Sequence, residues 1–557
     1  MSQPIKSFLR SSLGRTLLSL LITAGAGFVY FYITLPALNP HSGDFYSFLV
    51  LLCVVYLIAI FLLSGGRRSD VVMTPKERAR EWFRFIRSRC LPVGLLLAAA
   101  VLVSVVGELL SLPLLRAGAY RDLLTVQTGD FAADVAQISF NEIPTLDRTS
   151  AEYLGDRQMG TLSDMVSQFE YSGDSTQINY QGRPVRVAPI AYADLVKWIT
   201  NRGQGLPAYV VVDMVTQEAT VVRLPEGMKY SFSEPLNRNI QRHLRFQYPT
   251  MMFSTPEFEI DEEGHPWWIA PRMVKTIGLF GGTDIRGAVL VDAITGESQY
   301  YEDVPTWVDT LYVPELIMEQ YDYHGTLVHG FFNSLLGQRD VTITTDGYNY
   351  IAMNDDVYAY TGITSANADQ SNLGFLLCNM RTKDTHFYEA PGATEAAAQA
   401  SAMGVVQDLG YVATFPLLLN IAGEPTYFIP LKDATDLVKS YAMVNVAQYQ
   451  IVATGSSVSA CEQSYIQMLA DKGVTIQEEL PQTEVSGTVA ELRSAVLDGN
   501  TTYFLRLEGS PVFYALSLKD CREAVTLNVG DSVTIQHEIS TEDGASILDA
   551  YSMVIGR

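Results

Sequence analysis

Three long apolar runs within the first 115 residues constrain this chain more than any other feature. They cover Leu17–Leu35, Phe45–Leu63 and Leu91–Leu115, and Glu108 is the only acidic residue inside them. A helix needs about 20 apolar residues to cross the hydrocarbon core of a bilayer. Three buried core helices are the alternative, which the length and near lack of charge of the runs disfavour. Residues 1–115 are therefore predicted to form a three-span membrane domain.

Basic residues near these runs predict their orientation. Lys6, Arg10 and Arg15 precede the first run, the connection ALNPHSGD has no Lys or Arg, and the second connection, residues 64–90, has eight. Cytoplasmic loops carry the excess of Lys and Arg. The N-terminus and the basic loop 64–90 are therefore expected in the cytoplasm of a bacterial cell, and the chain after Leu115 is expected outside its cytoplasmic membrane.

A cleaved signal peptide is the alternative for the first run, because Ala24-Gly25-Ala26 resembles a cleavage site. The apolar run continues past that site, and cleavage leaves the later residues on the same side of the membrane.

The basic loop contains a predicted helix. In TPKERAREWFRFIRSR, Thr74 is placed as the cap, Pro75 in the first turn and Glu77 three residues after the cap. Its aromatic residues lie among arginines, which favours a helix on the anionic lipid of the inner leaflet. A topology signal alone accounts for the same residues equally well.

Charge divides the chain after the runs. The first 113 residues hold 11 of the 38 Lys and Arg and 5 of the 61 Asp and Glu, which leaves 27 basic and 56 acidic residues and a net charge of −29. Such a body repels phosphate backbones, so no nucleic acid partner is expected. The five cysteines are few and widely spaced, which predicts no zinc site and leaves at most one disulfide open.

A hairpin motif occurs three times in the outer part. An apolar run reaches Asp213, Asp292 or Asn379, a turn follows, and a second strand-like run comes next. The Asp or Asn side chain can accept hydrogen bonds from N–H groups two or three residues on. Gly296 supplies a residue that tolerates positive φ in the second copy. These four residues are predicted structural turn positions.

A second marker has the same period. Gly182, Gly264, Gly347 and Gly423 each lie in the middle of a predicted hairpin, 82, 83 and 76 residues apart. The body is therefore α+β, with about four repeats of two hairpins and a helix over residues 171–475. Residues 116–170 are predicted to form a helical neck, opened by Thr149 and Glu152 at capping-box spacing. Five strand-like runs over residues 483–557 match the order of an OB-like β-barrel.

The D-x-x-T-G-E turn and the strand–helix order resemble PepSY-type extracytoplasmic modules. The whole layout is similar to uncharacterised three-span envelope membrane proteins of Gram-positive-type bacteria. The resemblance implies binding or regulation in the envelope and supplies no catalytic residues.

The search for chemistry yields weak candidates. The glycine-rich GLFGGTDIRG, residues 278–287, lacks the ending of a phosphate loop and is predicted to be a turn. His324 and His329 are five apart, which does not suit a helical zinc pair. Asp355 and Asp356 could serve as catalytic carboxylates or hold Ca²⁺, but solvated turns are the favoured interpretation. No catalytic residue, cofactor or metal is predicted.

Aromatic residues are the preferred binding candidates. Trp267 and Trp268 are adjacent in a strand, so they face opposite sides, and Trp307 follows the next hairpin. An exposed aromatic surface could stack on a sugar ring or bury part of a partner protein.

The sequence thus predicts a non-enzymatic scaffold, binding or accessory protein of the cell envelope, with other envelope proteins or a cell-wall polymer as partners and membrane lipid around its spans. One alternative is an envelope hydrolase that uses carboxylates of the third repeat. The other is an accessory subunit of a membrane transporter, with Glu108 as a polar contact inside the membrane.

The orientation predicts which cysteines an impermeant thiol reagent reaches on intact cells. Cys378, Cys461 or Cys521 should react once the outer body is unfolded, whereas Cys90 should not. Mass spectrometry of the labelled peptides measures this. Labelling of Cys90 alone would contradict the predicted orientation.

Overall fold

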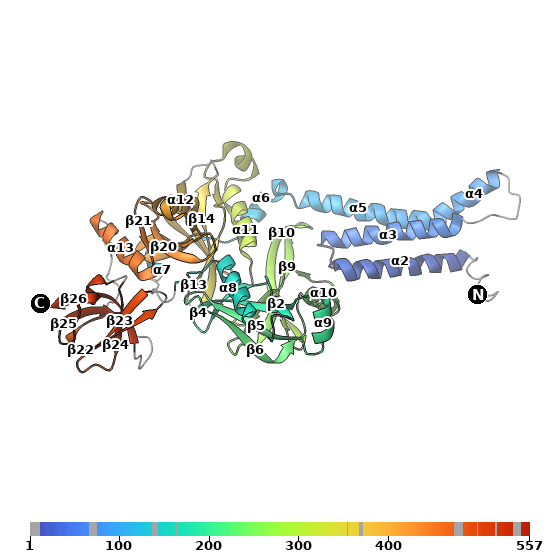
Figure 1. Cartoon of the computed structure of the whole chain (residues 1–557). Coiled ribbons are helices and arrows are strands. Elements are labelled where there is room, and N and C mark those ends of the chain that lie inside the picture. The colour runs from blue at the N-terminus through green and yellow to red at the C-terminus, as the bar shows by residue number, and fades with distance from the viewer. Residues whose placement is uncertain are drawn as a thin grey trace. The chain divides into compact units, whose positions relative to one another are not determined.

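The chain is a mixed α+β protein, with three apolar helices at its N-terminus followed by a β-rich body (Figure 1). It folds into two compact units, one of residues 1–129 with 144–389 and one of residues 130–143 with 390–557. The computed structural model describes residues 12–65, 75–135, 143–162, 164–353, 355–366, 371–472, 483–497, 500–518, 521–537 and 547–556. Five residues used in the predictions of orientation and of the basic helix lie outside these ranges. They are the basic residues Lys6, Arg10, Arg67 and Arg68 and the expected helix cap Thr74.

Each predicted apolar run forms a helix long and apolar enough to cross a membrane. The third helix ends before the expected Leu115, because Leu112 is extended ahead of Pro113 and interrupts it. A short helix, α6 (Pro113–Arg121), follows. The other helices of this region are α2 (Ser12–Thr34), α3 (Gly43–Gly65), α4 (Pro75–Phe85), a π-helical turn (Ile86–Cys90) and α5 (Leu91–Leu110).

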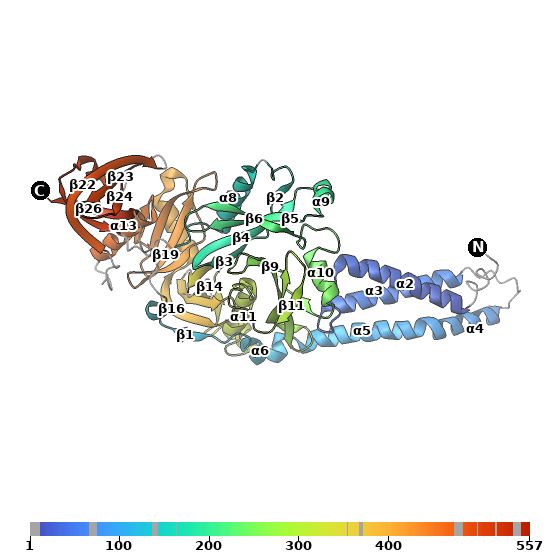
Figure 2. The ribbon, with the colours of Figure 1, turned by 90° about the horizontal axis from the view of Figure 1, so that it is seen from below.

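The spans leave most of their surface uncovered. Helix α3 packs against both α2 and α5 (Figures 1 and 2). Within the most apolar stretch of each span, only 11%, 22% and 11% of the residues are buried. A helix that is apolar on all sides needs an apolar environment on all sides. Lipid, or helices of another protein, must supply it here.

In the first unit, helix α10 (Ile240–Gln247) of the body binds the end of α2. Arg242 lies over the Tyr32 ring, 4.2 Å from its centre, and its Nε donates a hydrogen bond of 3.2 Å to the Tyr32 carbonyl oxygen. Arg245 Nε donates a bond of 2.9 Å to the Leu35 carbonyl oxygen. Phe246 meets Phe31 edge to face at 5.4 Å. Both arginines satisfy carbonyl groups that the end of a helix leaves without partners.

Four sheets in the body share one strand order. In the first, the long strand β4 pairs with β3 and β2 along one edge and with β5 along the other, and β6 pairs with β5. The same arrangement recurs around the long strands β9, β14 and β19. The third sheet gains β1, which pairs in parallel with β16.

The strands of the first sheet are β2 (Phe169–Tyr171), β3 (Thr176–Tyr180), β4 (Arg183–Tyr192), β5 (Leu206–Asp213) and β6 (Ala219–Met228). Those of the second are β7 (Met252–Phe253), β8 (Glu257–Ile260), β9 (Pro266–Ile277), β10 (Gly281–Asp292) and β11 (Ser298–Tyr301). The third holds β1 (Gln127–Gly129), β12 (Thr342–Thr344), β13 (Asn349–Met353), β14 (Asp356–Ser365), β15 (Ser371–Asn379) and β16 (Thr385–Ala393). Helices beside these sheets are α8 (Arg148–Gly160), α9 (Leu195–Asn201), α10 (Ile240–Gln247), α11 (Pro314–Thr326) and a π-helical turn (Asn333–Gly337).

The region predicted as a helical neck contains α7 (Phe131–Asp134), α8 and most of α6, and two short strands at residues 127–129 and 169–171 connect it to the sheets. Strand β1 joins the third sheet and β2 joins the first, while α8 packs on β2, β5 and β6. The cap of α8 is also not the predicted Thr149. Asp147 accepts a hydrogen bond of 3.0 Å from the Ser150 N–H, and Glu152 binds Arg148 at 2.7 Å. Asp two residues earlier competes for the cap position because its carboxylate is an equally good acceptor.

The repeated turn has the hydrogen bonds expected from its sequence. Asp292 Oδ1 accepts bonds of 2.7 and 3.0 Å from the N–H groups of Ile294 and Thr295. Asp213 Oδ1 and Asn379 Oδ1 each accept two equivalent bonds, at 2.8 and 2.9 Å respectively. The φ angle of Gly296 is +79°. The other two copies place Gln217 and Lys383 at positive φ, so the turn requires this conformation even without glycine.

The second unit holds the fourth sheet and the C-terminal strands. Asn420 Nδ2 donates a bond of 2.7 Å to the Val135 carbonyl oxygen, which ties the segment after α7 to this sheet. The elements with this sheet are α7 (Phe131–Asp134), α12 (Glu395–Val405), a 3₁₀ turn (Gln407–Leu409), β17 (Val412–Ala413), β18 (Leu417–Ile421), β19 (Glu424–Lys432), β20 (Val438–Asn445), β21 (Val452–Gly455) and α13 (Val458–Asp471).

The C-terminal strands pair in the order β22-β23-β24-β26-β25, and β22 also pairs with β25. Their inner side chains, among them Val489, Leu505, Leu516 and Ile535, form a separate apolar core. The elements are β22 (Thr483–Leu497), β23 (Asn500–Leu507), β24 (Phe513–Ser517), a 3₁₀ turn (Arg522–Thr526), β25 (Ser532–His537) and β26 (Ile547–Gly556).

The turn analysis predicts that Gly296→Val destabilises the first unit by roughly 1 kcal/mol or more, because a side chain disfavours positive φ. A Cβ at this position would also collide with the ring of Tyr230. Asp292→Asn should cost less, since an amide oxygen can still accept the two turn hydrogen bonds. Thermal unfolding of the purified full-length chain measures both. Equal, negligible shifts would contradict the role given to this turn.

Candidate functional site

A cavity lies between α6, α11 and the turn that joins β9 to β10. It begins with the turn between β9 and β10, the glycine-rich stretch that the sequence marked as a turn. Ser111, just after α5, accepts hydrogen bonds of 3.0 Å at its Oγ from the N–H groups of both Leu279 and Phe280. A Cβ on Gly107 would overlap these two side chains, so glycine lets the turn lie directly on the helix. The third span and the second sheet are thereby held together.

Two tyrosines complete this junction. Tyr120 on α6 is buried, and its hydroxyl donates a hydrogen bond of 2.5 Å to the Ser111 carbonyl oxygen. Its ring lies 4.7 Å from the ring of Tyr323 on α11. Helices that are far apart in the sequence therefore meet at the turn.

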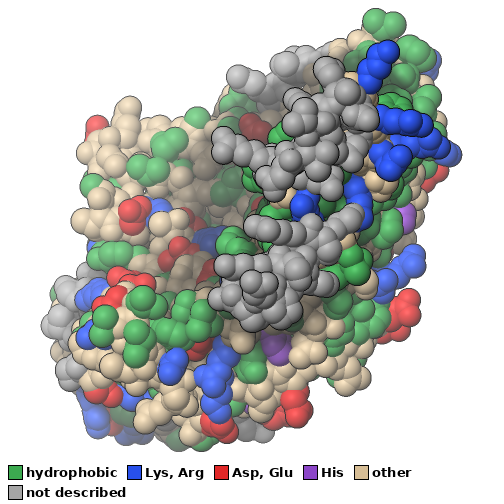
Figure 3. All heavy atoms as spheres, turned by 90° about the vertical axis from the view of Figure 1, so that its right-hand side faces the viewer, with side chains coloured by type: hydrophobic (Ala, Val, Ile, Leu, Met, Phe, Trp, Pro, Cys, Tyr) green, Lys and Arg blue, Asp and Glu red, His purple; other side chains and the backbone are tan. Residues whose placement is uncertain are grey.

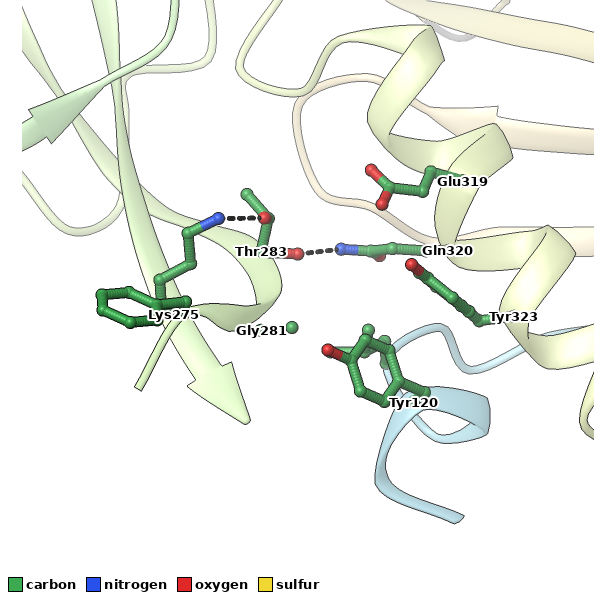
Figure 4. A pocket seen from close by; sticks show the side chains of 10 residues that line it. Tyr120, Lys275, Gly281, Thr283, Glu319, Gln320 and Tyr323 are labelled. Atoms are coloured by element: carbon green, nitrogen blue, oxygen red, sulfur yellow. Dashed lines mark hydrogen bonds between the residues drawn. The ribbon is translucent and has the colours of Figure 1, made fainter. Parts of the chain in front are cut away.

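Between these elements is a cavity of about 170 Å³ (Figure 4). Lys275 on β9 donates a hydrogen bond of 2.7 Å to Thr283 Oγ1, and Gln320 Nε2 donates one of 2.7 Å to the Thr283 carbonyl oxygen. Gln320 is 1% exposed, and its Oε1 has no hydrogen-bond donor among the residues that the structure describes. The described residues that line the cavity are Tyr120, Leu123, Lys275, Phe280, Gly281, Gly282, Thr283, Glu319, Gln320 and Tyr323.

Both signs of charge act in this cavity. Burial lowers the pKa of Lys275, and the negative charges of Glu319 and Glu108 oppose that shift. Burial also raises the pKa of Tyr120, and the same two carboxylates add to it. Of the two carboxylates, Glu319 on α11 has the larger effect and Glu108, in the last turn of α5, the smaller. An ammonium group, a carboxylate and an unsatisfied amide oxygen can together hold a small polar molecule.

A second cluster of polar groups lies between the sheets of the first unit. Glu259 on β8 is fully buried and accepts hydrogen bonds of 3.0 and 2.9 Å from the N–H groups of Asp309 and Thr310. Asp309 is 2% exposed, and its Oδ2 accepts a bond of 2.6 Å from the N–H of Asn179 on β3. Burial raises the pKa of both carboxyls, and the charge of Glu259 raises that of Asp309 further. These carboxyls join backbone segments of the first and second sheets.

The third repeat uses a carboxylate in a similar way. Asp356 is buried and accepts hydrogen bonds of 2.8 and 2.7 Å from the guanidinium of Arg381, and one of 2.8 Å from Asn379 Nδ2. The expectation of a solvated turn is wrong for Asp356, because the neighbouring turn supplies it with a cation and an amide donor. Asp355 is more exposed, with φ of +66°, and its Oδ1 lies 3.4 Å from Asn179 Nδ2.

This contact also explains why the third copy of the turn has Asn. In the first and second copies, the turn aspartates lie 3.8 Å from Arg183 and 3.3 Å from His265. In the third copy Asp356 occupies the facing position, so an aspartate at 379 would meet a second carboxylate. Asn379 caps the turn with its oxygen and binds Asp356 with its nitrogen.

The nominated tryptophans divide as their alternation requires. Trp268 is fully buried, and its Nε1 donates a bond of 2.9 Å to the Tyr230 carbonyl oxygen. Trp267 is half-buried, and its ring lies 5.9 Å from that of the half-buried Trp307. Both of these rings pack on the apolar core beneath the second sheet. Trp267 and Trp307 thus form one partly exposed aromatic pair.

The predicted histidine pair separates. His324 Nδ1 lies 3.2 Å from the Arg121 carbonyl oxygen, and His329 Nε2 lies 2.9 Å from Asp340 Oδ2. Among the described residues, no group of three or more His, Cys, Asp or Glu could hold a metal ion. All five cysteines are free, so the disulfide left open by the sequence is not formed.

The cavity and the buried carboxyls were not predicted from the sequence. Lys275 and Gln320 carry no local motif, and the cavity exists because α6 and α11 meet the β9–β10 turn. Glu257 and Glu259 were detectable, since their alternation in an apolar strand places both on one face.

Neither the family models nor the curated proteins searched contain a match to this chain.

The buried carboxyls predict that stability falls as pH rises. Their pKa is raised in the folded state, so above about pH 4 the unfolded chain releases protons that the folded chain keeps. The unfolding temperature should therefore decline from about pH 5 to about pH 8. Asp309→Asn should flatten this decline, because an amide does not ionise.

Melting curves of the full-length chain across this pH range measure the effect. Asp303→Asn is the matched control, because Asp303 is exposed and only six residues away. Parallel declines in the wild type and Asp309→Asn would contradict the assignment.

Proposed function

We propose that this chain is a membrane-anchored binding or scaffold protein of the bacterial cell envelope. Its three spans lie in the cytoplasmic membrane, with the basic loop 64–90 inside and the acidic body outside. Its partner is another envelope protein or a cell-wall polymer. The excess of Lys and Arg in loop 64–90 supports this orientation.

The main support for this proposal is that the buried carboxylates bind groups of neighbouring segments and hold those segments together. A glycoside hydrolase needs two carboxyl groups that face a substrate cleft. Asp356 is instead bound by Arg381 and Asn379, and Glu259 and Asp309 accept backbone hydrogen bonds between sheets. Groups held this way stabilise the arrangement of the repeats. This favours a scaffold over the hydrolase alternative.

The strand order of residues 483–557 supports an OB-type barrel at the end of this scaffold. In that fold, five strands close in the order 1-2-3-5-4, as β22-β23-β24-β26-β25 do. The parallel pairing of β24 with β26 and the 3₁₀ turn before β25 agree with it. The resemblance of the repeats to PepSY-type modules also implies binding or regulation. The barrel is proposed as a packing or docking module.

The transporter alternative has one observation in its favour. Glu108 is coupled electrostatically to Lys275 and to the cavity beside the end of α5. A ligand in that cavity would act on the third span and the body together, which suits an accessory or sensory subunit.

Partner capture should depend on the Trp267 and Trp307 pair, because interface energy concentrates in a few large side chains. Trp267→Leu with Trp307→Leu should weaken capture from native membranes by cross-linking while retaining an apolar side chain on the core. Trp268→Phe is the buried control and should lower the unfolding temperature with less effect on capture. Quantitative mass spectrometry of the cross-linked material measures both.

The hydrolase alternative predicts that the aspartates of the third repeat are essential for function, whereas the scaffold proposal predicts that they are not. Asp355→Asn should leave capture and complementation of a deletion strain near normal, since that aspartate serves a turn. Asp356→Ala should lower stability through loss of the Arg381 pair, so Asp356→Asn is the informative variant. Loss of complementation from the two Asn variants, with the unfolding temperature intact, would refute the scaffold proposal.

A further inference from the structure

An apolar surface on the first unit lies beside the end of α2. We define the α9 surface as Leu195, Val196 and Ile199 on α9, together with Leu236 in the segment before α10 and Phe246 on α10. These side chains are 61%, 64%, 53%, 50% and 47% exposed, respectively. Isolated exposed leucines are normal, but three large apolar side chains exposed on one short helix mark an interaction site.

Hydrogen bonds fix α9 to the segment that touches the membrane span. Trp198, on the buried side of α9, donates a bond of 2.7 Å from Nε1 to Glu234 Oε2. Arg238 Nη1 donates one of 2.7 Å to the Arg202 carbonyl oxygen. Three residues beyond Glu234, Asn237 Oδ1 accepts a bond of 3.2 Å from the hydroxyl of Tyr32.

Tyr32 marks the level of the membrane surface. It lies in the last turn of α2, and Tyr is enriched where spans leave the hydrocarbon. Glu234 and Asn237 are only three residues apart, so one short segment links the Trp198 indole to Tyr32. In two perpendicular views α9 lies level with α10, at the end of the body that meets the spans (Figures 1 and 2).

The charges around the α9 surface suit anionic lipid. Lys197, Arg202 and Arg238 flank it, although the body as a whole is strongly acidic. Of the acidic groups facing it, Glu234 is buried between Tyr192 and Trp198, and Asp194 accepts a bond of 2.8 Å from the Lys197 N–H as the cap of α9. Seen from the side of the spans, hydrophobic side chains lie together with Lys and Arg on this face of the body (Figure 3).

We infer that the α9 surface inserts into the headgroup region of the same leaflet in which α2 ends. Its apolar side chains enter the boundary of the hydrocarbon, and its basic side chains bind lipid phosphates, as in interfacial helices. Such helices penetrate about 5–10 Å into the boundary between headgroups and acyl chains. This shallow depth suits the short side chains of the α9 surface at the level of Tyr32. The body is then held to the bilayer at a second point to one side of the spans, which limits its tilt.

The test uses the full-length chain in vesicles of phosphatidylglycerol and phosphatidylethanolamine. An environment-sensitive fluorophore is attached at Val196→Cys in a Cys90→Ser background, because the other four cysteines are buried. Brominated lipids should quench this probe and aqueous iodide should not. Arg183→Cys is the matched control, because it lies at the far end of the ten-residue strand β4, about 30 Å away. Its probe should be quenched by iodide alone.

A second variant separates insertion from simple proximity. With the probe at Leu236→Cys, Ile199→Glu and Val196→Glu should abolish quenching by brominated lipids while leaving the unfolding temperature unchanged, since both positions are exposed. Vesicles of zwitterionic lipid alone should weaken the quenching. Iodide quenching at Val196→Cys equal to that at Arg183→Cys overturns the inference. Protection of Val196→Cys from both quenchers, with a dimer in cross-linking, also overturns it in favour of a second copy of this chain.

Discussion

Three helices that are apolar on every side need an apolar environment, and the rest of the first unit depends on where those helices end. The ends of α2 and α5 and the segment before α3 all contact residues 242–250 or the β9–β10 turn. Arginine side chains bind the terminal carbonyl groups of α2, and the Ser111 hydroxyl binds two N–H groups of the β9–β10 turn. A helix end needs such partners because its last carbonyl groups have none inside the helix. These contacts hold the second sheet next to the three apolar helices.

Within the body, buried carboxyl groups act as connectors. Glu259 and Asp309 bridge backbone segments, and Asp356 binds the turn of its own repeat. Burying a carboxyl is costly unless its acceptors are satisfied, and here backbone N–H or guanidinium groups satisfy them. The exchange of Asp for Asn at position 379 has the same origin, since the facing position already carries a carboxylate. Repeats that share one strand order thus differ in the turn residue that faces a charged side chain.

Much of the architecture could be predicted because it rests on local patterns. The apolar runs predicted the spans, and Asp292 with Gly296 predicted a turn whose hydrogen bonds involve residues two and three positions away. The strands at either end of the predicted neck could not be predicted, because β1 and β2 are short and exist only through pairing with β16 and β4. Trp267 and Trp268 were known to face opposite sides, but which one faces the core depends on the sheet that packs beneath them.

The sequence by itself determined that this chain has three helices long and apolar enough to cross a membrane, that its body is acidic and that one hairpin motif recurs. Each of these follows from composition or from spacing within a few residues, and local physics decides them. Only the tertiary structure decided that Lys275, Gln320 and Tyr120 share a cavity, that Asp356 is buried, and that α9 and Tyr32 bind the same short segment. Those outcomes join residues far apart in the chain, and their positions follow from how sheets and spans pack together.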